Sequence, residues 1–238
     1  MKRKVLVTGS TQGIGKAIAA AFVKEGDEVI VHCSKDMEKA ERIRKEIGAA
    51  HAVVADFLQW QKISELYQKT GPVDCLIINA SVQYKQTWEN ITDDAIDKQI
   101  DINIKSTLKL MQTYYPAMKQ NRFGRIVMIG SVNQHRRHPE LALYSATKCA
   151  DMSLVKNIAK QVAPFGVTVN NISPGAIVTP RNESVYNDEE QRTEVEKFIP
   201  MGRFGLPEDC VGAVLLLCGR GGDYITGADI AVDGGMSL

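Results

Sequence analysis

The sequence has no long apolar run and almost no excess of charge of one sign. Its 238 residues carry 29 basic and 28 acidic side chains, scattered rather than clustered, with a formal net charge of +1. This balance leaves no basic patch of the kind that nucleic acids and anionic membranes require. No stretch approaches the ~20 apolar residues of a membrane span, and the short apolar stretch near the start does not suit a secretory signal. We therefore expect a cytoplasmic protein, with neither nucleic acid nor membrane among its partners.

Cysteine is scarce and follows no metal-binding pattern. The five cysteines contain no Cys-x-x-Cys pair and no Cys/His spacing of a zinc site. An odd, scattered set is typical of reduced and mostly buried thiols, so we expect no metal site. The rest of the composition, 44% hydrophobic and 24% charged, is that of an ordinary globular protein. We expect one domain over residues 1–238.

Short apolar strands alternate with helical patterns along the whole chain. The strands are expected at residues 4–8, 28–33, 51–55, 73–78, 125–130, 167–172 and 229–232, and the helices at 16–25, 37–47, 63–69, 92–119, 143–161 and 207–218. Right-handed crossovers between such strands give a parallel sheet covered on both faces. We predict an α/β fold with a single Rossmann-type, doubly wound parallel sheet of about seven strands. The polar segment at about 181–205 is typical of an active-site lid.

A glycine-rich loop separates the first strand from the first helix. The loop reads T-G-S-T-Q-G-I-G. Gly9 permits a tight turn, Gly13 lets the backbone approach a pyrophosphate, and Gly15 allows the helix to pack closely on the strand. The helix N-terminus then offers free N–H groups to the anion. A plain turn is the alternative, but the position between strand and helix favours a dinucleotide site.

The end of the second strand bears on the choice of cofactor. NAD-binding proteins usually carry a carboxylate about 20 residues beyond the glycines, and this chain has Cys33 there, followed by Ser34 and Lys35. A hydroxyl and an ammonium suit the 2′-phosphate of NADP(H). The nearby Asp36 and the neutral Gln12 argue the other way. We predict NADP(H) as the preferred cofactor and leave NAD(H) open.

The stretch that ends in Y-S-A-T-K carries the chemistry. Tyr144 and Lys148 are four residues apart, so a helix places them on one face and the ammonium can stabilise a phenolate. Ser131 lies thirteen residues before Tyr144, at the end of an apolar strand. That places Ser131 at the crevice where open α/β sheets bind ligands.

These motifs together resemble the classical short-chain dehydrogenase/reductase family from end to end. T-G-S-T-Q-G-I-G resembles its glycine loop, I-N-A-S its N-N-A-G segment, S-P-G-A-I-V-T its P-G-x-x-x-T element and I-A-V-D-G-G its last strand. Asp56 matches the adenine-binding acid, although it can equally serve as the N-cap of the next helix. Asn103, Ser131, Tyr144 and Lys148 match the catalytic set. Ile78 and Ser81 depart from the family, and a side chain at Ser81 is expected to crowd the cofactor.

The resemblance implies hydride transfer between a nicotinamide and a carbonyl or alcohol carbon. It implies that Tyr144 acts as general acid and base and that Ser131 hydrogen-bonds the substrate oxygen. Lys148 would hold the ribose hydroxyls of the nicotinamide, and Asn103 would position a water that links Lys148 to solvent. The implied cofactor-binding residues are Gly9, Ser10, Thr11, Gln12, Gly13, Ile14, Gly15, Ser34, Lys35, Asp56, Asn79, Ala80, Tyr144, Lys148, Pro174, Gly175, Ile177 and Thr179. A homotetramer is the family expectation. A regulator that senses the cofactor without catalysis is a remote alternative.

The substrate is the least determined property. Gln134 and His135 follow the serine by three and four residues, so at least one of them is expected to line the substrate pocket with Ser131 and Tyr144. A polar wall favours an oxygen-rich or anionic substrate. The chain is similar to the 3-oxoacyl-[acyl-carrier-protein] reductases, so we place a 3-oxoacyl thioester slightly ahead of a sugar or polyol. Arg122 and Arg125 are candidates for receiving an acidic acyl carrier protein.

Overall fold

Seven parallel strands form one sheet in the computed structural model, which describes residues 2–238. The strands are β1 (Lys4–Val7), β2 (Glu28–Cys33), β3 (His51–Val54), β4 (Cys75–Ile78), β5 (Gly124–Ile129), β6 (Val167–Pro174) and β7 (Asp229–Val232). Their order across the sheet is β3-β2-β1-β4-β5-β6-β7, and every neighbouring pair is parallel. The chain order reverses between β1 and β4, and the predicted doubly wound sheet is confirmed.

The central strands are apolar on both faces because helices cover both. Leu6 of β1 lies in one hydrophobic core, whereas Val5 and Val7 lie in the other. This alternation is what a pleated strand imposes, since successive side chains point to opposite faces. Strands buried on both faces read as continuous apolar runs, which is why the sequence revealed them.

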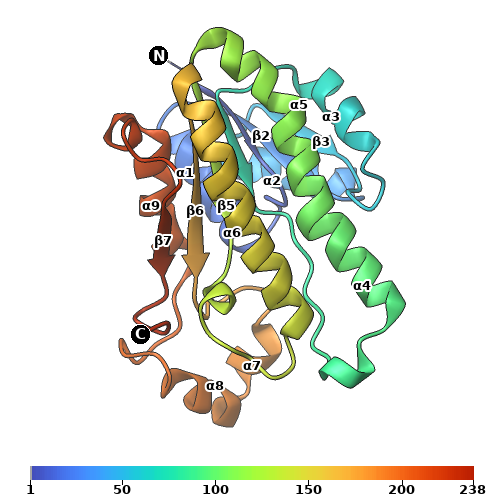
Figure 1. Ribbon diagram of the computed structural model, residues 1–238, viewed down its shortest axis with the longest axis vertical. Coiled ribbons are helices and arrows are strands. Elements are labelled where there is room, and N and C mark those ends of the chain that lie inside the picture. The colour runs from blue at the N-terminus through green and yellow to red at the C-terminus, as the bar shows by residue number, and fades with distance from the viewer. Residues whose placement is uncertain (1) are drawn as a thin grey trace.

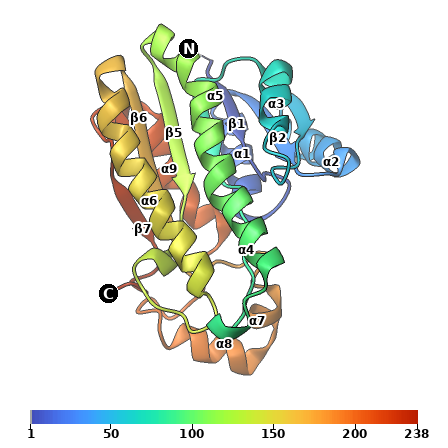
Figure 2. The same cartoon turned by 45° about the vertical axis from the view of Figure 1, so that its right-hand side comes forward.

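The helices divide between the two faces. Their bounds are α1 (Gly13–Lys24), α2 (Met37–Ile47), α3 (Lys62–Thr70), α4 (Asp93–Gln99), α5 (Ser106–Asn121), α6 (Ala142–Val162), α7 (Glu183–Asn187), α8 (Glu189–Glu196) and α9 (Val211–Cys218). Side chains of α1, α2 and α9 enter one core, and those of α3, α5 and α6 enter the other. Figures 1 and 2 show α5 and α6 side by side in front of the sheet.

The single long helix expected at 92–119 contains a change of helix type. Thr92 caps α4 by accepting from the backbone of Ala95, and a π-helical turn at Ile100–Lys105 joins α4 to α5 without a break. Such turns are rare and often lie at functional sites. Asn103 falls within this turn.

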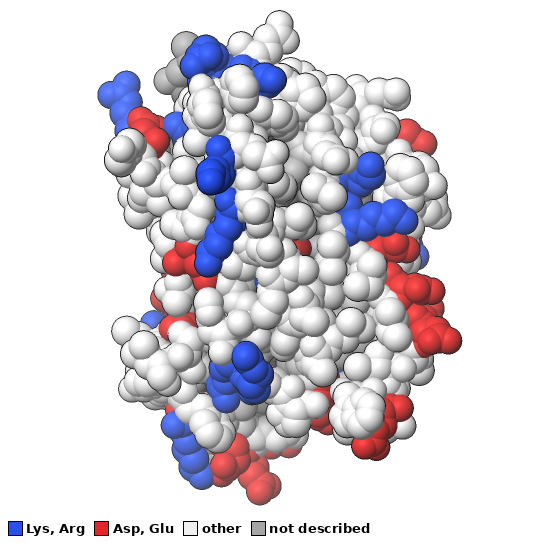
Figure 3. Space-filling model, in the orientation of Figure 1, with Lys and Arg blue, Asp and Glu red and all other residues white. Residues whose placement is uncertain are grey.

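The carboxyl ends of the strands face the lower end of the molecule in Figure 1, where α7 and α8 lie. Both short helices fall within the predicted lid segment. The acidic and basic groups on the face in Figure 3 lie in small separate groups and form no broad patch. Within residues 2–238, no helix has both the length and the apolar character that crossing a membrane demands.

Candidate active site

A cleft of about 910 Å³ opens at the carboxyl ends of the strands. The loops after successive strands line it: Gly9, Thr11, Gln12, Gly13 and Ile14 after β1, Ser34 and Lys35 after β2, Asp56 after β3, Asn79, Ala80 and Ser81 after β4, Ser131 after β5, and Pro174, Gly175, Ile177 and Thr179 after β6. Tyr144, on α6, also lines it. The switch in strand order thus produces the crevice in which doubly wound sheets bind ligands.

The glycine loop has the shape of an anion cradle. Gly9 and Gly13 have φ of +62° and +53°, the left-handed region that glycine tolerates best. A Cβ at Gly15 would come within 2.5 Å of Asn79 Nδ2, so the helix packs closely there. Gln12 makes no side-chain cap on α1, and the first N–H groups of the helix are left for a ligand. Ser10 is fully buried, and its hydroxyl donates to Val7 O instead of facing the cleft.

A buried histidine to which the sequence assigned no role braces this loop. The Gly9 N–H donates to His32 Nδ1 at 3.0 Å, and His32 Nε2 lies 3.0 Å from Ala55 O. Because Nδ1 accepts, Nε2 carries the proton and donates to Ala55. Burial lowers the pKa of His32 to about 4, so the ring is neutral at pH 7. The ring therefore links the glycine loop to the end of β3 in one protonation state.

Two lysines lie at the end of the cleft lined by the loops after β1, β2 and β3, which is the predicted cofactor end. Lys35 Nζ pairs with Asp56 Oδ2 at 3.3 Å, and Lys39 Nζ donates to Gln12 Oε1 at 2.7 Å. Asp36 is the N-cap of α2, where it accepts from the backbone of Lys39. The sequence overlooked Lys39, whose only signal was its place in the first turn of the helix after β2.

Asp56 does not cap the helix that follows it. Its Oδ1 accepts from the backbone N–H of Leu58, and α3 begins at Lys62 with Gln61 as its N-cap. The alternative role as an N-cap is therefore wrong. Asp56 instead lines the cleft, and its contact with the adenine stays a prediction.

The loop after β4 supports the glycine loop. The Asn79 amide donates to Thr8 O at 2.9 Å and to Gly9 O at 3.0 Å. On the other side of the cleft, Thr179 lies against Gly13, where an added Cβ would be 3.1 Å from Thr179 Cγ2. The segments after β1, β4 and β6 therefore enclose one continuous site.

Ser131 and Tyr144 reach the same cleft with their hydroxyl groups available. Both are buried, at 7% and 3% exposure, and both line the cleft. Ser131 Oγ accepts from the backbone N–H of Asn133 at 3.2 Å, which leaves its own proton for another acceptor. Each hydroxyl can therefore donate a hydrogen bond to a ligand in the cleft.

Lys148 lies behind Tyr144 and has an acidic partner that the sequence interpretation missed. Its Nζ is 5.8 Å from the centroid of the Tyr144 ring and donates to Ile129 O and to Asp151 Oδ2, each at 3.2 Å. Burial raises the pKa of the Asp151 carboxyl, and the Lys148 ammonium opposes that rise. The signal for Asp151 was in the sequence, since residues 144, 148 and 151 share one helix face.

Asn103 braces the site from the π-helical turn. Its Oδ1 accepts from Val82 N, and its Nδ2 donates to Val82 O and to Thr147 Oγ1. The amide thereby ties the loop after β4 to α6. A water between Asn103 and Lys148 stays a prediction from the family resemblance.

Arg181 contacts two residues of the site. Its Nη2 donates to Ser81 O at 2.7 Å and to Ser81 Oγ at 3.0 Å, while its Nη1 lies 3.5 Å from the Tyr144 hydroxyl. Ser81, expected to crowd the cofactor, serves here as an acceptor for this guanidinium.

Gln134 and His135 do not lie where the sequence led us to expect them. Neither lines the cleft. Gln134 Nε2 and His135 Nε2 each lie 2.6 Å from Asp229 Oδ2, at the start of β7. The short 3₁₀ turn at Val132–Gln134 directs them to the neighbouring strands, whereas Asn133 and Arg136 face the cleft.

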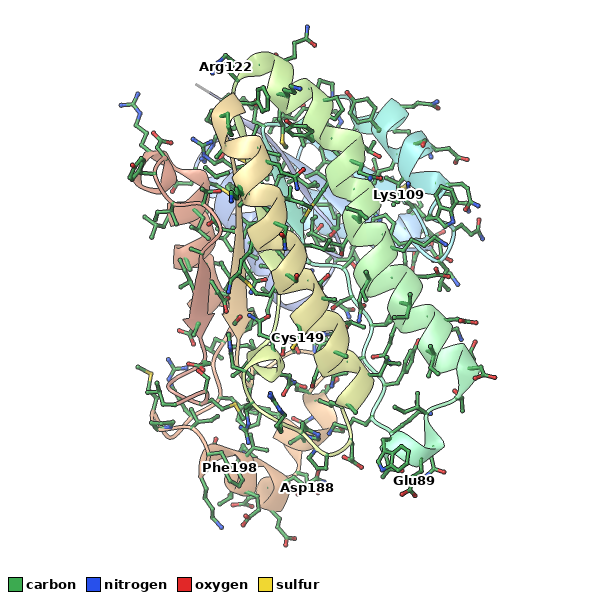
Figure 4. The ribbon with its side chains drawn as sticks, viewed as in Figure 1. Glu89, Lys109, Arg122, Cys149, Asp188 and Phe198 are labelled. Atoms are coloured by element: carbon green, nitrogen blue, oxygen red, sulfur yellow. The ribbon has the colours of Figure 1, made fainter. Side chains whose placement is uncertain are left out.

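Arg122 and Arg125, the predicted pair for docking a carrier protein, differ in their surroundings. Arg125 is only 5% exposed and pairs with Asp223 at 2.6 Å, so its role is structural and its assignment to docking is wrong. Arg122 lies at the opposite end of the molecule from Phe198, whose side chain lines the cleft (Figure 4).

Known proteins are similar to this chain over nearly its whole length. A family model described as enoyl-(acyl carrier protein) reductase matches residues 9–237. The 3-oxoacyl-[acyl-carrier-protein] reductase FabG of Rickettsia conorii is 34% identical over 234 residues, which cover 98% of this chain and 96% of that protein. The chain belongs to the short-chain dehydrogenase/reductase family. FabG of Staphylococcus aureus is 33% identical and covers 100% of this chain and 99% of its own length.

Solved structures of family members agree with the fold. A 3-oxoacyl (acyl-carrier-protein) reductase from Agrobacterium tumefaciens with NADP bound superposes with a TM-score of 0.91, at 35% identity, and the match covers 98% of this chain and 93% of that one. A gluconate 5-dehydrogenase from Burkholderia cenocepacia in complex with NADP and tartrate superposes with a TM-score of 0.92, at 27% identity, and the match covers 100% of this chain and 96% of that one. The fold therefore accommodates different substrate classes.

Proposed function

We propose that this short-chain dehydrogenase/reductase transfers a hydride between the nicotinamide of NADP(H) and a carbonyl or alcohol substrate. The observation that carries the proposal is that Ser131 and Tyr144 both line a cleft that begins at an uncapped helix N-terminus. The cradle of Gly9, Gly13 and the first turn of α1 suits a pyrophosphate. Once bound, the dinucleotide would supply the hydride in reduction and accept it in oxidation.

The chain's own groups then hold the oxygen and move the proton. Ser131 donates a hydrogen bond to the substrate oxygen and fixes its distance from the nicotinamide. In reduction, Tyr144 gives its phenolic proton to that oxygen as negative charge develops on it, and in oxidation the phenolate takes the proton back. The Lys148 ammonium, behind the ring, stabilises the phenolate. Proton supply from solvent through Asn103 belongs to this proposal.

The preference for NADP(H) rests on the lysines at the cofactor end. We expect NADPH to bind more tightly than NADH, and we expect Lys35→Ala to remove most of the difference. A charge-assisted hydrogen bond to the 2′-phosphate is worth about 1.5–3 kcal/mol, or roughly 10- to 150-fold in affinity. Fluorescence titration with both nucleotides measures the ratio.

Lys45→Ala is the matched control, because Lys45 is exposed near the far end of α2 and lies outside the cleft. Lys45→Ala should leave the ratio of NADPH to NADH affinity unchanged. The NADH affinity of each variant serves as its internal reference. Equal binding of NADH and NADPH by the unaltered protein would contradict the assigned preference. If the NADPH-to-NADH affinity ratio were unchanged in Lys35→Ala but fell in Lys39→Ala, Lys39 would be the residue that binds the 2′-phosphate.

The first candidate substrate is a 3-oxoacyl thioester. The support is the name of the FabG relatives, which match nearly the full chain at 32–34% identity. A sugar or polyol is the second candidate, favoured by the polar side chains that line the cleft, such as Asn133 and Asn182, and by the gluconate 5-dehydrogenase fold match. Comparing kcat/KM for acetoacetyl thioesters with values for aldoses and ketoses decides between them. A clear preference for a large apolar ketone would sink both.

Assembly, location and the carrier partner stay predictions. The long helices α5 and α6 run side by side on one face, an arrangement suited to pairing across a two-fold axis, with a second contact through β7 giving a tetramer. Light scattering should therefore return a mass near four chains of 26.2 kDa, and a monomer at micromolar protein would exclude the tetramer. We also propose an acyl carrier protein as a partner and a cytoplasmic location.

Residues 181–205 are proposed to act as a lid over the active site, and two of them, Val185 and Phe198, line the cleft.

A further inference from the structure

The cleft has an excess of cations at its substrate end. Among residues 2–238, Asp56 is the one acidic side chain that lines it, and Asp56 lies at the cofactor end, after β3. Besides Lys35 and Lys39, the cationic side chains that line the cleft are Lys85, Lys98, Arg136, Arg137 and Arg181. A cleft lined mostly by charge of one sign attracts a ligand of the opposite sign.

Arg181 is a cleft-lining cation that contacts Tyr144. Its guanidinium is fixed by two hydrogen bonds to Ser81 and reaches within 3.5 Å of the Tyr144 hydroxyl. It pairs with no carboxylate among residues 2–238. An arginine held in place beside the reacting position, without an anionic partner of its own, has the properties of an anion receptor.

We infer that the substrate is a short oxo acid or hydroxy acid whose carboxylate binds Arg181, with Ser81 as the residue that positions the guanidinium. The inference rests on the proposed function, because it takes Tyr144 as the group that binds the reacting oxygen. It narrows that function to substrates with a free carboxylate, in place of a neutral thioester or a neutral sugar.

The separation of the two groups limits the size of the substrate. A reacting oxygen lies about 2.7 Å from the Tyr144 oxygen, and a carboxylate oxygen about 2.8 Å from a guanidinium nitrogen. Adding the 3.5 Å between Tyr144 Oη and Arg181 Nη1 keeps these two substrate oxygens within about 9 Å of each other. The carboxylate therefore belongs to the same short carbon chain as the carbonyl, and not to a remote part of a carrier.

Arg136 supplies a second guanidinium at this end of the cleft. It stacks over Phe198 at 5.4 Å, and its Nη1 is buried with no hydrogen-bond partner among the described residues. A buried, unpaired donor is costly unless a ligand satisfies it. Hydroxyl or carboxylate oxygens of a polar acid can do so, whereas an alkyl chain cannot.

Matched pairs of oxo acids and their ethyl esters test the assignment. Pyruvate, acetoacetate and levulinate are each compared with the corresponding ester, which has the same ketone and lacks the charge. With NADPH as reductant, kcat/KM for the acid should exceed that for its ester by about tenfold or more in at least one pair. In Arg181→Gln the acid-to-ester ratio should fall by about 10- to 100-fold.

The ratio cancels general damage to the site, and Arg137→Gln controls for overall charge. Arg137 is exposed on the same cleft, and within residues 2–238 its side chain makes one hydrogen bond, to His135 O at 3.4 Å. Its loss should change the ratio by no more than about threefold, as expected for a screened charge. Ser81→Gly should lower the ratio less than Arg181→Gln does, because the charge remains while its support is lost.

Three results would overturn the inference. They are an ester preference in every pair, an acid-to-ester ratio that Arg181→Gln leaves unchanged, and an equal fall of the ratio in Arg137→Gln and Arg181→Gln. In each of these cases the esters are still reduced and the proposed function stands. If no ketone of any kind oxidises NADPH, the proposed function itself fails, and the inference fails with it.

Discussion

Replacing Tyr144 with phenylalanine should lower kcat by about 10²- to 10⁴-fold, the range in which a positioned general acid contributes. The substitution removes one oxygen and keeps the ring. Tyr144 is only 3% exposed and lines the cleft, so phenylalanine fills the same space without a cavity. Steady-state rates of NADPH oxidation with a saturating ketone measure the effect.

Cofactor binding separates this loss from a structural one. The dinucleotide should bind to Tyr144→Phe within about tenfold of its normal affinity, because one neutral hydrogen bond contributes only about 0.5–1.5 kcal/mol. Tyr115→Phe is the matched control, since Tyr115 lies on α5, packs against the core and is absent from the cleft lining. It should retain full activity. Near-normal turnover by Tyr144→Phe would refute the assigned mechanism, and an equal loss in both variants would point to general destabilisation.

The fold was predictable because it depends on patterns that repeat along the chain. Apolar strands such as β5 alternate with helices such as α6, and right-handed crossovers leave few topologies open. Several strand ends differ from the expected ones by one or two residues, since an apolar run does not show where pairing stops: β4 begins at Cys75 rather than at Val73. The π-helical turn at Ile100–Lys105 carries no comparable pattern and was invisible.

The site was predictable where a motif fixes local geometry. The four-residue spacing of Tyr144 and Lys148 on α6 needs no information from elsewhere. The prediction that Gln134 or His135 lines the pocket failed for the opposite reason. Their direction depends on a three-residue 3₁₀ turn and on Asp229, which lies 95 residues further along the chain from Gln134. The contact of Arg181 with Ser81, 100 residues apart, is likewise a product of the tertiary structure.

The buried pair of Lys148 and Asp151 leads to the second large effect, on stability. Their side chains are 3% and 1% exposed, with Nζ and Oδ2 at 3.2 Å. Taking a charge out of water is costly, and its partner offsets that cost. Removing one member leaves the other buried and uncompensated. Asp151→Ala should therefore lower the free energy of unfolding by about 3–5 kcal/mol, measured by urea denaturation at pH 7.

A double-mutant cycle isolates the charge pairing from the loss of packing. Asp151→Asn is the first control, because it keeps the size and an amide oxygen to accept from Lys148 but removes the charge. Lys148→Met is the second, and the double variant Lys148→Met/Asp151→Ala completes the cycle. The double variant has neither charge. Its loss in the free energy of unfolding should therefore be smaller, by at least about 2 kcal/mol, than the summed losses of the two single variants, which is within the range of coupling seen for contacting residues.

Equal m-values across the set are required, so that the differences report stability and not a change in the exposed surface. If Asp151→Ala cost less than about 1 kcal/mol, or if the two single losses simply added, the two side chains would not behave as a coupled buried pair. Lys148 would then be held mainly by its bond to Ile129 O, at 3.2 Å. Coupling would instead assign Asp151 to the site, as the residue that holds the lysine ammonium in place behind Tyr144.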